Sequence, residues 1–479
     1  MAVDAIVLRK VREAKAPVPR KLVPLLRYLL FHIYFVPTSI VLLPIYLIRS
    51  ILPFLRQDPR WSFLQNLSVL YVRRVIRVYC RLRTQPIQPR EDGWRESNSH
   101  LGTLLEFANM SGPGGRVIVH PKEAIQAAEQ AAGKRTDRVW IDPPPLEAFR
   151  GILTINTAGP GKGFAHCKTY AGPPLVEPGF AKVRTRCFWF MHKDGLRPPH
   201  RSEKKKRDRP VILYFHGGAG VTFGAGDPFM GQCLAVNMAH TTGIDVFSVD
   251  YLLAPTSRWP GHIVQALAGW FYLTRELGYD PSQIIIGGDS FGGALTLQLT
   301  RYLLTDFPSY EGYDVESAAA RKGEKPGALL LLSPFCDARN DGDNVPPCYA
   351  VNHKRDIILL AYGEWGHDAQ GVFYGAENQK RCPIGKADPW FSQVLLPDAE
   401  LAEYPPMYVM NGGNELLIDQ GHEFVARARK AGAVNVAHDV VEHGVHDYWT
   451  LHTFLPEARE SYSRFKKWWS TVERTQSHL

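Results

Sequence analysis

Short apolar runs alternate with glycine-containing loops between about residues 184 and 460. Residues 211–215, 284–286 and 407–410 are rich in β-branched and other apolar side chains, and each run leads into a loop that contains glycine. Residues 434–441 form a further candidate strand, and 294–299 have the composition of a helix. Apolar runs of this length, separated by helical stretches, are typical of strands buried on both faces of a parallel sheet. The pattern predicts an α/β fold with a mostly parallel central sheet flanked by helices.

The N-terminal 60 residues follow a different pattern. Residues 28–48 contain no charged side chain and are long enough for a helix to cross ~30 Å of hydrocarbon. Pro37 and Pro44 lie inside this stretch and would kink such a helix, so a shallow or hairpin-like insertion is an alternative to a crossing. The stretch is also longer than the ~7–15 apolar residues of a cleaved signal peptide. We therefore predict a basic segment and membrane anchor over residues 1–60.

Residues 61–183 are expected to hold an amphipathic helix and a cap or lead-in region. Over residues 61–83 apolar side chains alternate with arginines, as in a helix that lies on a membrane or packs on the catalytic domain. Glycine and proline interrupt the rest, with one helical run at 121–132. A second insertion, 334–396, carries aromatic residues that either line a substrate pocket or pack in the core: Trp365, Phe373, Tyr374, Trp390 and Phe391.

Ser290 lies where one of the predicted strands turns into a helix. Gly288 and Gly292 flank it, and their lack of a Cβ leaves room for a sharp turn that exposes the serine hydroxyl. A G-x-S-x-G pentapeptide is weak evidence alone, but here the strand and the helix stand in the required places. A nucleophilic serine needs a histidine base, a carboxylate and donors for an oxyanion.

The chain supplies these groups in the order serine, acid, histidine, which is the order of the α/β-hydrolases. The loop 216–220, His-Gly-Gly-Ala-Gly, follows a strand and can present backbone amides. Glu415 follows the strand at 407–410, with Asp419 close behind it, and His446 follows the last strand. From these residues alone, Asp419 is an alternative acid and His443 an alternative base.

With these motifs the chain resembles the hormone-sensitive-lipase-like branch of the α/β-hydrolases, which has an HGGG-type loop and a GDSxGG elbow. The resemblance covers about residues 184–460 and implies that Ser290 is the nucleophile and His446 the general base. It also implies that the backbone amides of Gly218, Ala219 and Phe291 form an oxyanion hole. Gly217 would shape the loop.

Two positions depart from the family pattern. Ala219 stands where the third loop glycine is usual, and it can still donate its amide. Glu415 stands where aspartate is usual, while Asp419 corresponds to a second, commonly acidic position without a catalytic role. Glutamate serves as the acid in some members of the fold. The resemblance therefore implies a triad of Ser290, Glu415 and His446.

The resemblance implies that residues 184–470 form a catalytic domain, a serine hydrolase that cleaves carboxylic esters through an acyl-enzyme. A hydrophobic lipid, a sterol ester or an acetylated metabolite is the expected substrate. Acyl transfer or amide cleavage would use the same triad, and a non-catalytic small-molecule receptor would keep the pocket. No cofactor is expected, and no metal, because Cys336, Cys348 and Cys382 lack the spacing of a zinc site. The oligomeric state is left open.

The charge distribution bears on partners and location. Much of the basic excess behind the net charge of +9 falls in the first 85 residues, which favours a membrane over nucleic acid as partner. More basic residues precede the apolar stretch than follow it closely, so we expect a single-pass protein of the endoplasmic reticulum with a lumenal catalytic domain. Asn66 and Asn109 would then be glycan acceptors.

Overall fold

A computed structural model describes residues 23–82 and most of 138–477. The gaps within the second range are 156–174, 177, 194–195, 197, 201–206, 208, 228, 255–256, 308–324, 341–343, 371–383 and 453–454. The helix expected at 121–132 lies outside the described residues, as do Asn109, Phe373, Tyr374 and Cys382.

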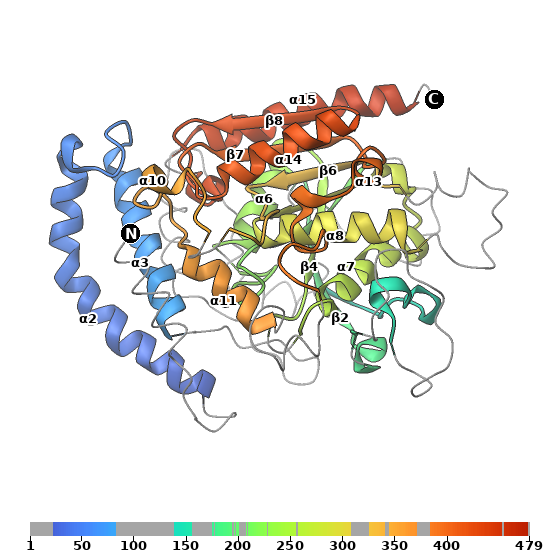
Figure 1. The fold of residues 1–479 in the computed structure, drawn as a ribbon, viewed down its shortest axis with the longest axis horizontal. Helices are drawn as coiled ribbons and strands as arrows, with labels where there is room; N and C mark the ends of the chain where they lie inside the picture. The colour runs from blue at the N-terminus through green and yellow to red at the C-terminus, as the bar shows by residue number, and fades with distance from the viewer. Residues whose placement is uncertain are drawn as a thin grey trace.

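An eight-stranded sheet forms the centre of the molecule (Figure 1), in the order β1-β2-β4-β3-β5-β6-β7-β8. Strands β1 and β2 are antiparallel to their neighbours, and all pairs from β4 to β8 are parallel. The predicted α/β-hydrolase fold with a mostly parallel sheet is confirmed. The strands are β1 (Arg138–Ile141), β2 (Thr185–Phe190), β3 (Val211–Phe215), β4 (Asp245–Asp250), β5 (Ile284–Asp289), β6 (Ala328–Leu332), β7 (Met407–Gly412) and β8 (Val436–Val441).

Helices cover both faces of the sheet, which is why its inner strands are apolar at nearly every position. On β3, Leu213 packs into one core, whereas Ile212 and Tyr214 pack into the other, because successive side chains point to opposite faces. The first core contains side chains of α7 (Gly261–Phe271), α8 (Phe291–Thr305) and α14 (Ile418–Ala431). The second contains side chains of α6 (Gly231–Thr242), α11 (Leu360–Gln370) and α15 (Glu457–Ser477).

Short helical elements connect these parts of the chain. Two of them are single α-helical turns, α10 (Tyr349–Asn352) and α13 (Asp398–Leu401), and η5 is a π-helical turn (Tyr272–Glu276). The others are 3-10 turns: η1 (Pro53–Leu55), η2 (Leu146–Ala148), η3 (Gly151–Leu153), η4 (Pro178–Lys182), η6 (Pro281–Gln283), η8 (Gln393–Leu395) and η9 (Tyr448–Leu451).

The N-terminal region forms two long helices, α2 (Val23–Ile51) and α3 (Phe63–Leu82). Among the described residues, one segment, Leu29–Ile51 in α2, is long and apolar enough to cross a membrane. Helix α3 buries Val69, Val72, Val75 and Ile76 in the second core, which also contains Tyr214 of β3. Of the two arrangements considered for this amphipathic helix, packing on the catalytic domain is the one observed.

The structure decides three expectations from the sequence. Asn66 is fully buried between α3 and α2, where its amide donates to Ser50 Oγ at 2.9 Å, so the expectation that it is a glycan acceptor is wrong. In the insertion, Trp365, Trp390 and Phe391 are core residues, which is the packing alternative. Strand β1 comes from the region assigned to the cap and lead-in, yet it belongs to the central sheet.

Candidate active site

Ser290 occupies a strained turn between β5 and α8. Its backbone angles, φ 51° and ψ −115°, lie where side chains are rarely found. Gly288 and Gly292 allow this turn, because backbone atoms pack where a Cβ on either residue would lie. A Cβ on Gly292 would lie 2.0 Å from the carbonyl oxygen of Phe215, and one on Gly288 would lie 2.4 Å from the backbone of Gly292. The sequence therefore predicts this turn correctly, for the steric reason given.

Asp289 ties the turn to the glycine-rich loop after β3. Its carboxylate accepts the backbone N–H of Gly217 at 2.9 Å and the hydroxyl of Tyr214. Complete burial, and then the nearby charge of Asp447, raise the pKa of Asp289 well above its usual value. The amide of Gly217 is thus engaged by Asp289, which fits a role in shaping the loop.

The loop backbone adopts left-handed angles at the next two residues, φ 105° at Gly218 and φ 55° at Ala219. The Gly218 carbonyl accepts the amides of Val221 and Thr222 at 3.0 Å each, which holds the loop in a tight turn. Ala219 lines one cavity together with Ser290 and Phe291. The oxyanion hole stays a prediction. Two of its expected donors, Ala219 and Phe291, line the same cavity as Ser290.

His216 at the start of this loop has a structural environment. Its buried ring stacks on Tyr251, with ring centroids 4.3 Å apart, and its Nδ1 lies 2.8 Å from the Gly217 carbonyl oxygen. Burial lowers the pKa of His216, although the Asp250 charge opposes this effect. This ring therefore serves to hold the loop.

The structure brings Glu415 and His446 together in the interior. His446 Nδ1 lies 3.8 Å from Glu415 Oε2, which is ion-pair range but too long for a hydrogen bond. Glu415 Oε2 accepts the hydroxyl of Ser333 at 2.5 Å, and the amide of Asn411 donates to Oε1. Burial raises the pKa of Glu415 to about 8, with partial relief from the His446 charge and the Ser333 hydrogen bond.

The two alternatives left open by the sequence lie apart from this pair. Asp419 in α14 accepts the backbone N–H of Cys348 at 2.7 Å. The ring of His443 is about a third exposed, and its Nε2 lies 3.9 Å from Glu442. The geometry thus favours Glu415 over Asp419 and His446 over His443.

The sequence did not reveal two further carboxylates beside His446. Asp447 Oδ2 lies 3.1 Å from His446 Nε2, and both side chains are buried. Asp356 accepts the backbone N–H of His446 at 2.9 Å and that of Leu416 at 2.7 Å. Asp447 follows His446 directly in the sequence, so adjacency was a usable signal. Asp356 lies 90 residues away in the insertion, without a motif.

These carboxylates decide the charge of the histidine. Burial favours the neutral imidazole, but the Asp447 charge and hydrogen bond, followed by the charges of Glu415 and Asp356, outweigh it and raise the pKa of His446 to about 10. In a serine triad, Nδ1 faces the acid and Nε2 faces the serine hydroxyl. Here Nδ1 faces Glu415 as expected, whereas Nε2 faces Asp447.

Ser290 is linked to the Glu415–His446 pair through the end of β6. The Ser290 amide donates to the Leu332 carbonyl at 2.9 Å, and the next residue, Ser333, donates to Glu415. Ser333 Oγ also accepts the amide of Asp447 at 3.2 Å. A direct contact between the His446 imidazole and Ser290 Oγ stays a prediction.

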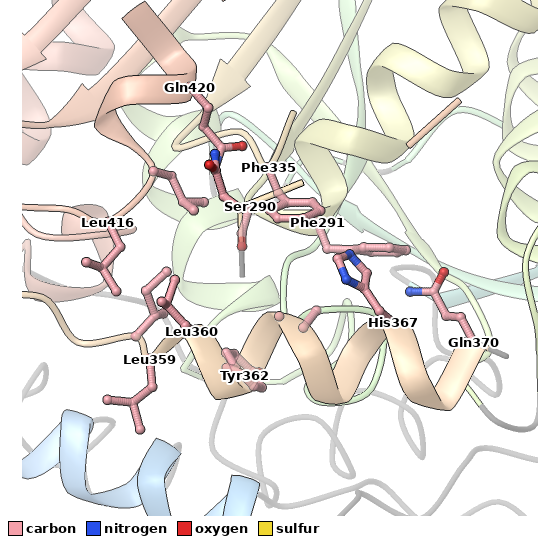
Figure 2. A pocket seen from close by; sticks show the side chains of 15 residues that line it. Ser290, Phe291, Phe335, Leu359, Leu360, Tyr362, His367, Gln370, Leu416 and Gln420 are labelled. Atoms are coloured by element: carbon pink, nitrogen blue, oxygen red, sulfur yellow. The ribbon is translucent and has the colours of Figure 1, made fainter. Parts of the chain in front are cut away.

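The Ser290 hydroxyl points into a cavity of about 630 Å³, a volume that includes its open mouth (Figure 2). Its walls come from the loop after β3, the insertion and the start of α14, and they are mainly apolar. The insertion lines the cavity, although not with its tryptophans. No group of three or more histidine, cysteine or acidic side chains suited to a metal occurs in the part of the chain that the structure describes. The lining residues include Ala219, Phe291, Phe335, Ile358, Leu359, Leu360, Tyr362, His367, Gln370, Leu416, Leu417 and Gln420.

Residues 212–450 match the α/β-hydrolase fold family. The chain is 28% identical over 296 residues to an ethyl acetate hydrolase of Pseudomonas putida, covering 60% of this chain and 80% of that protein. It is 28% identical over 284 residues to arylacetamide deacetylase-like 2 of Homo sapiens, covering 52% and 69%. The structure of an esterase of the bacterial hormone-sensitive lipase family superposes with a TM-score of 0.47 at 20% identity, covering 78% and 96% of the two chains.

Proposed function

Because the chain belongs to the α/β-hydrolase fold family, we propose that it is a serine hydrolase that cleaves carboxylic esters. The observation that carries the proposal is the strained Ser290 turn, which aims a hydroxyl into an apolar cavity. A backbone held at a costly φ is retained where the surrounding structure enforces it, and such strain clusters at reactive sites.

In the proposed mechanism, His446 takes the proton of Ser290 as the serine oxygen attacks the ester carbonyl. Glu415 stabilises the imidazolium from the Nδ1 side, at 3.8 Å. Amides of Gly218, Ala219 and Phe291 hold the oxyanion that forms. The alcohol leaves with the proton from His446, and water, activated by the same base, releases the acid from the acyl-enzyme. This cycle requires Nε2 to leave Asp447 for Ser290.

The cavity and the relatives together support an apolar ester as substrate. Ile358, Leu359, Leu360, Leu416 and Leu417 form much of the cavity wall, so an acyl or alcohol group without charge is favoured there. The two relatives described above are named for the hydrolysis of ethyl acetate and for arylacetamide deacetylation. Acetate esters of hydrophobic alcohols are therefore the first substrates to assay.

The N-terminal helix supports attachment to a membrane. Leu29–Ile51 has the length and composition of a membrane segment, and its side chains are mostly exposed. We include membrane attachment in the proposed function. Residence in the endoplasmic reticulum and a lumenal catalytic domain stay predictions.

A fluorophosphonate probe tests the nucleophile. The purified full-length protein should be labelled covalently, and Ser290→Ala should abolish both labelling and hydrolysis of p-nitrophenyl acetate. Ser282→Ala is a matched control, because this serine is exposed and its hydroxyl donates only to Asp280, the N-cap of η6. A folded protein that neither reacts with the probe nor hydrolyses esters would refute the proposal and would fit a small-molecule receptor.

A further inference from the structure

Helix α2 lies lengthwise and antiparallel along α3. The ring of Phe31, near the start of α2, is 4.9 Å from that of Tyr79, near the end of α3. At the opposite end of the pair, the Asn66 amide in α3 donates to Ser50 Oγ in α2. Figure 1 shows α2 at the outer left edge and α3 between it and the rest of the molecule. The contacts thus cover almost the whole of the candidate membrane segment.

The polar residues in the middle of α2 face α3. The guanidinium of Arg74 donates to Thr38 Oγ1 and lies 3.4 Å from Ser39 Oγ. It also lies 5.2 Å from the centroid of the Phe35 ring. Arg74 is buried. The polar positions that weaken this segment as an isolated membrane helix are therefore used for its contact with α3.

Helix α3 is fixed in turn to the catalytic domain. Arg73 donates to the carbonyls of Asp356 at 2.5 Å and Ile358 at 3.2 Å, and its guanidinium is buried. Trp61, just ahead of α3, donates its indole N–H to the His443 carbonyl at 2.8 Å. Since His443 and Asp356 belong to segments around the candidate base, α2, α3 and the active-site loops form one packed unit.

This packing conflicts with a simple membrane crossing by α2. Its 29 residues extend roughly 40 Å. If α2 crossed the bilayer along its axis, α3 beside it would enter the hydrocarbon with its four arginines and the adjoining catalytic domain. A charged side chain at the bilayer centre is costly. The arginines are Arg73, Arg74, Arg77 and Arg81.

The face of α2 that points away from α3 is apolar and exposed. Ile33, Ile40 and Ile51 recur at near-helical spacing on this face, each more than half exposed, and Phe54 in η1 continues it at 76% exposure. Ahead of α2 the sequence is basic, with six lysines and arginines against two acidic residues in positions 1–22. An apolar helix face that follows a basic segment in the sequence fits an anionic lipid surface.

We propose that α2 and η1 lie in the plane of a membrane, with the outer face of α2 in the lipid and with the N-terminus and the catalytic domain on the same side. The inference rests on the membrane attachment proposed above, but it replaces the single crossing expected from the sequence. Arg73 holds the Ile358 carbonyl, and Leu359 points toward the blue N-terminal helices in Figure 2, so a wall of the cavity lies against the helix pair that would rest on the membrane. An ester dissolved in the bilayer would suit this arrangement.

Protease protection of the full-length protein in sealed microsomes tests the arrangement, with one epitope tag at each terminus. In-plane attachment predicts that both tags are digested or both protected. One digested and one protected tag would show a crossing and overturn the inference, while leaving membrane attachment intact. Recovery of the protein in the soluble fraction would refute attachment itself. Hydrolysis of a soluble ester in the same samples reports on the catalytic proposal separately.

A pair of variants tests the lipid-facing side directly. Ile40→Asp should lower partitioning of the protein into vesicles of phosphatidylcholine and phosphatidylserine by roughly tenfold or more, since burial of an isoleucine is lost. Val434→Asp is the matched control, because Val434 is similarly exposed but lies between α14 and β8. Both variants should keep the wild-type melting temperature. Equal partitioning of the two variants, or a dimer that Ile40→Asp dissociates without lipid, would overturn the proposal.

Discussion

Replacing Asp447 with asparagine tests whether this carboxylate keeps the candidate base protonated. Asp447 Oδ2 and His446 Nε2 are 3.1 Å apart and buried. Opposite unit charges at that distance attract by about 5 kcal/mol at an effective dielectric constant of ~20. A rise of the His446 pKa from 6.5 to about 10 corresponds to a similar energy, about 5 kcal/mol. Because burial opposes the rise, the three carboxylates together must supply more than this energy, and Asp447 makes the largest contribution among them. At a pKa of about 10, about 0.3% of the imidazole would be neutral at pH 7.5.

The sign of the effect follows from the charge that is removed. Without the Asp447 carboxylate the imidazolium loses stabilisation, so the pKa of His446 falls and more of the base is neutral near pH 7.5. The wild-type kcat/KM should rise with pH up to about 10. In Asp447→Asn this rise should occur at lower pH, and kcat/KM at pH 7.5 should increase about tenfold or more.

The assay is a profile of kcat/KM against pH from 6 to 10 with a soluble p-nitrophenyl ester, together with melting temperatures at each pH. Asp419→Asn is the control, since Asp419 bonds the Cys348 amide and not the imidazole. A profile of Asp447→Asn that rises at the same pH as the wild type would refute the reasoning. A uniform loss of activity at every pH would instead assign Asp447 to the proton transfer or to the site's architecture.

Three further predictions concern the triad and the turn. Glu415→Gln should lower kcat/KM about 100-fold or more, whereas Asp419→Asn should stay within about threefold, because only Glu415 faces His446 Nδ1; equal losses would argue against this acid. Gly292→Ala should lower the melting temperature sharply or prevent folding, since its Cβ would lie 2.0 Å from the carbonyl oxygen of Phe215 in β3. Gly363→Ala on α11 should leave the melting temperature unchanged, because that Cβ would enter open space. Similar melting curves for the two variants would contradict the steric account. His443→Ala should keep activity within about threefold, and an inactive folded variant would move the base.

The fold could be read from the sequence because its signals are local. A strand buried on both faces must be apolar at successive positions, and β3, β5 and β7 show this directly. Helix α3 shows the opposite case. Its alternation of apolar residues and arginines fits a lipid surface and a protein surface equally well. Tertiary contacts, such as those of Arg73 with two carbonyls, distinguish the two.

The sequence by itself determined the Ser290 turn, because the steric demand of a sharp strand-to-helix turn falls on residues two positions away, where only glycine fits. The tertiary structure alone decided the electrostatic surroundings of His446. Asp356, Glu415 and Asp447 come from separate parts of the chain and meet around one buried ring. Charge interactions depend on distance through space and on the exclusion of water, and the order of residues along the chain gives neither of these.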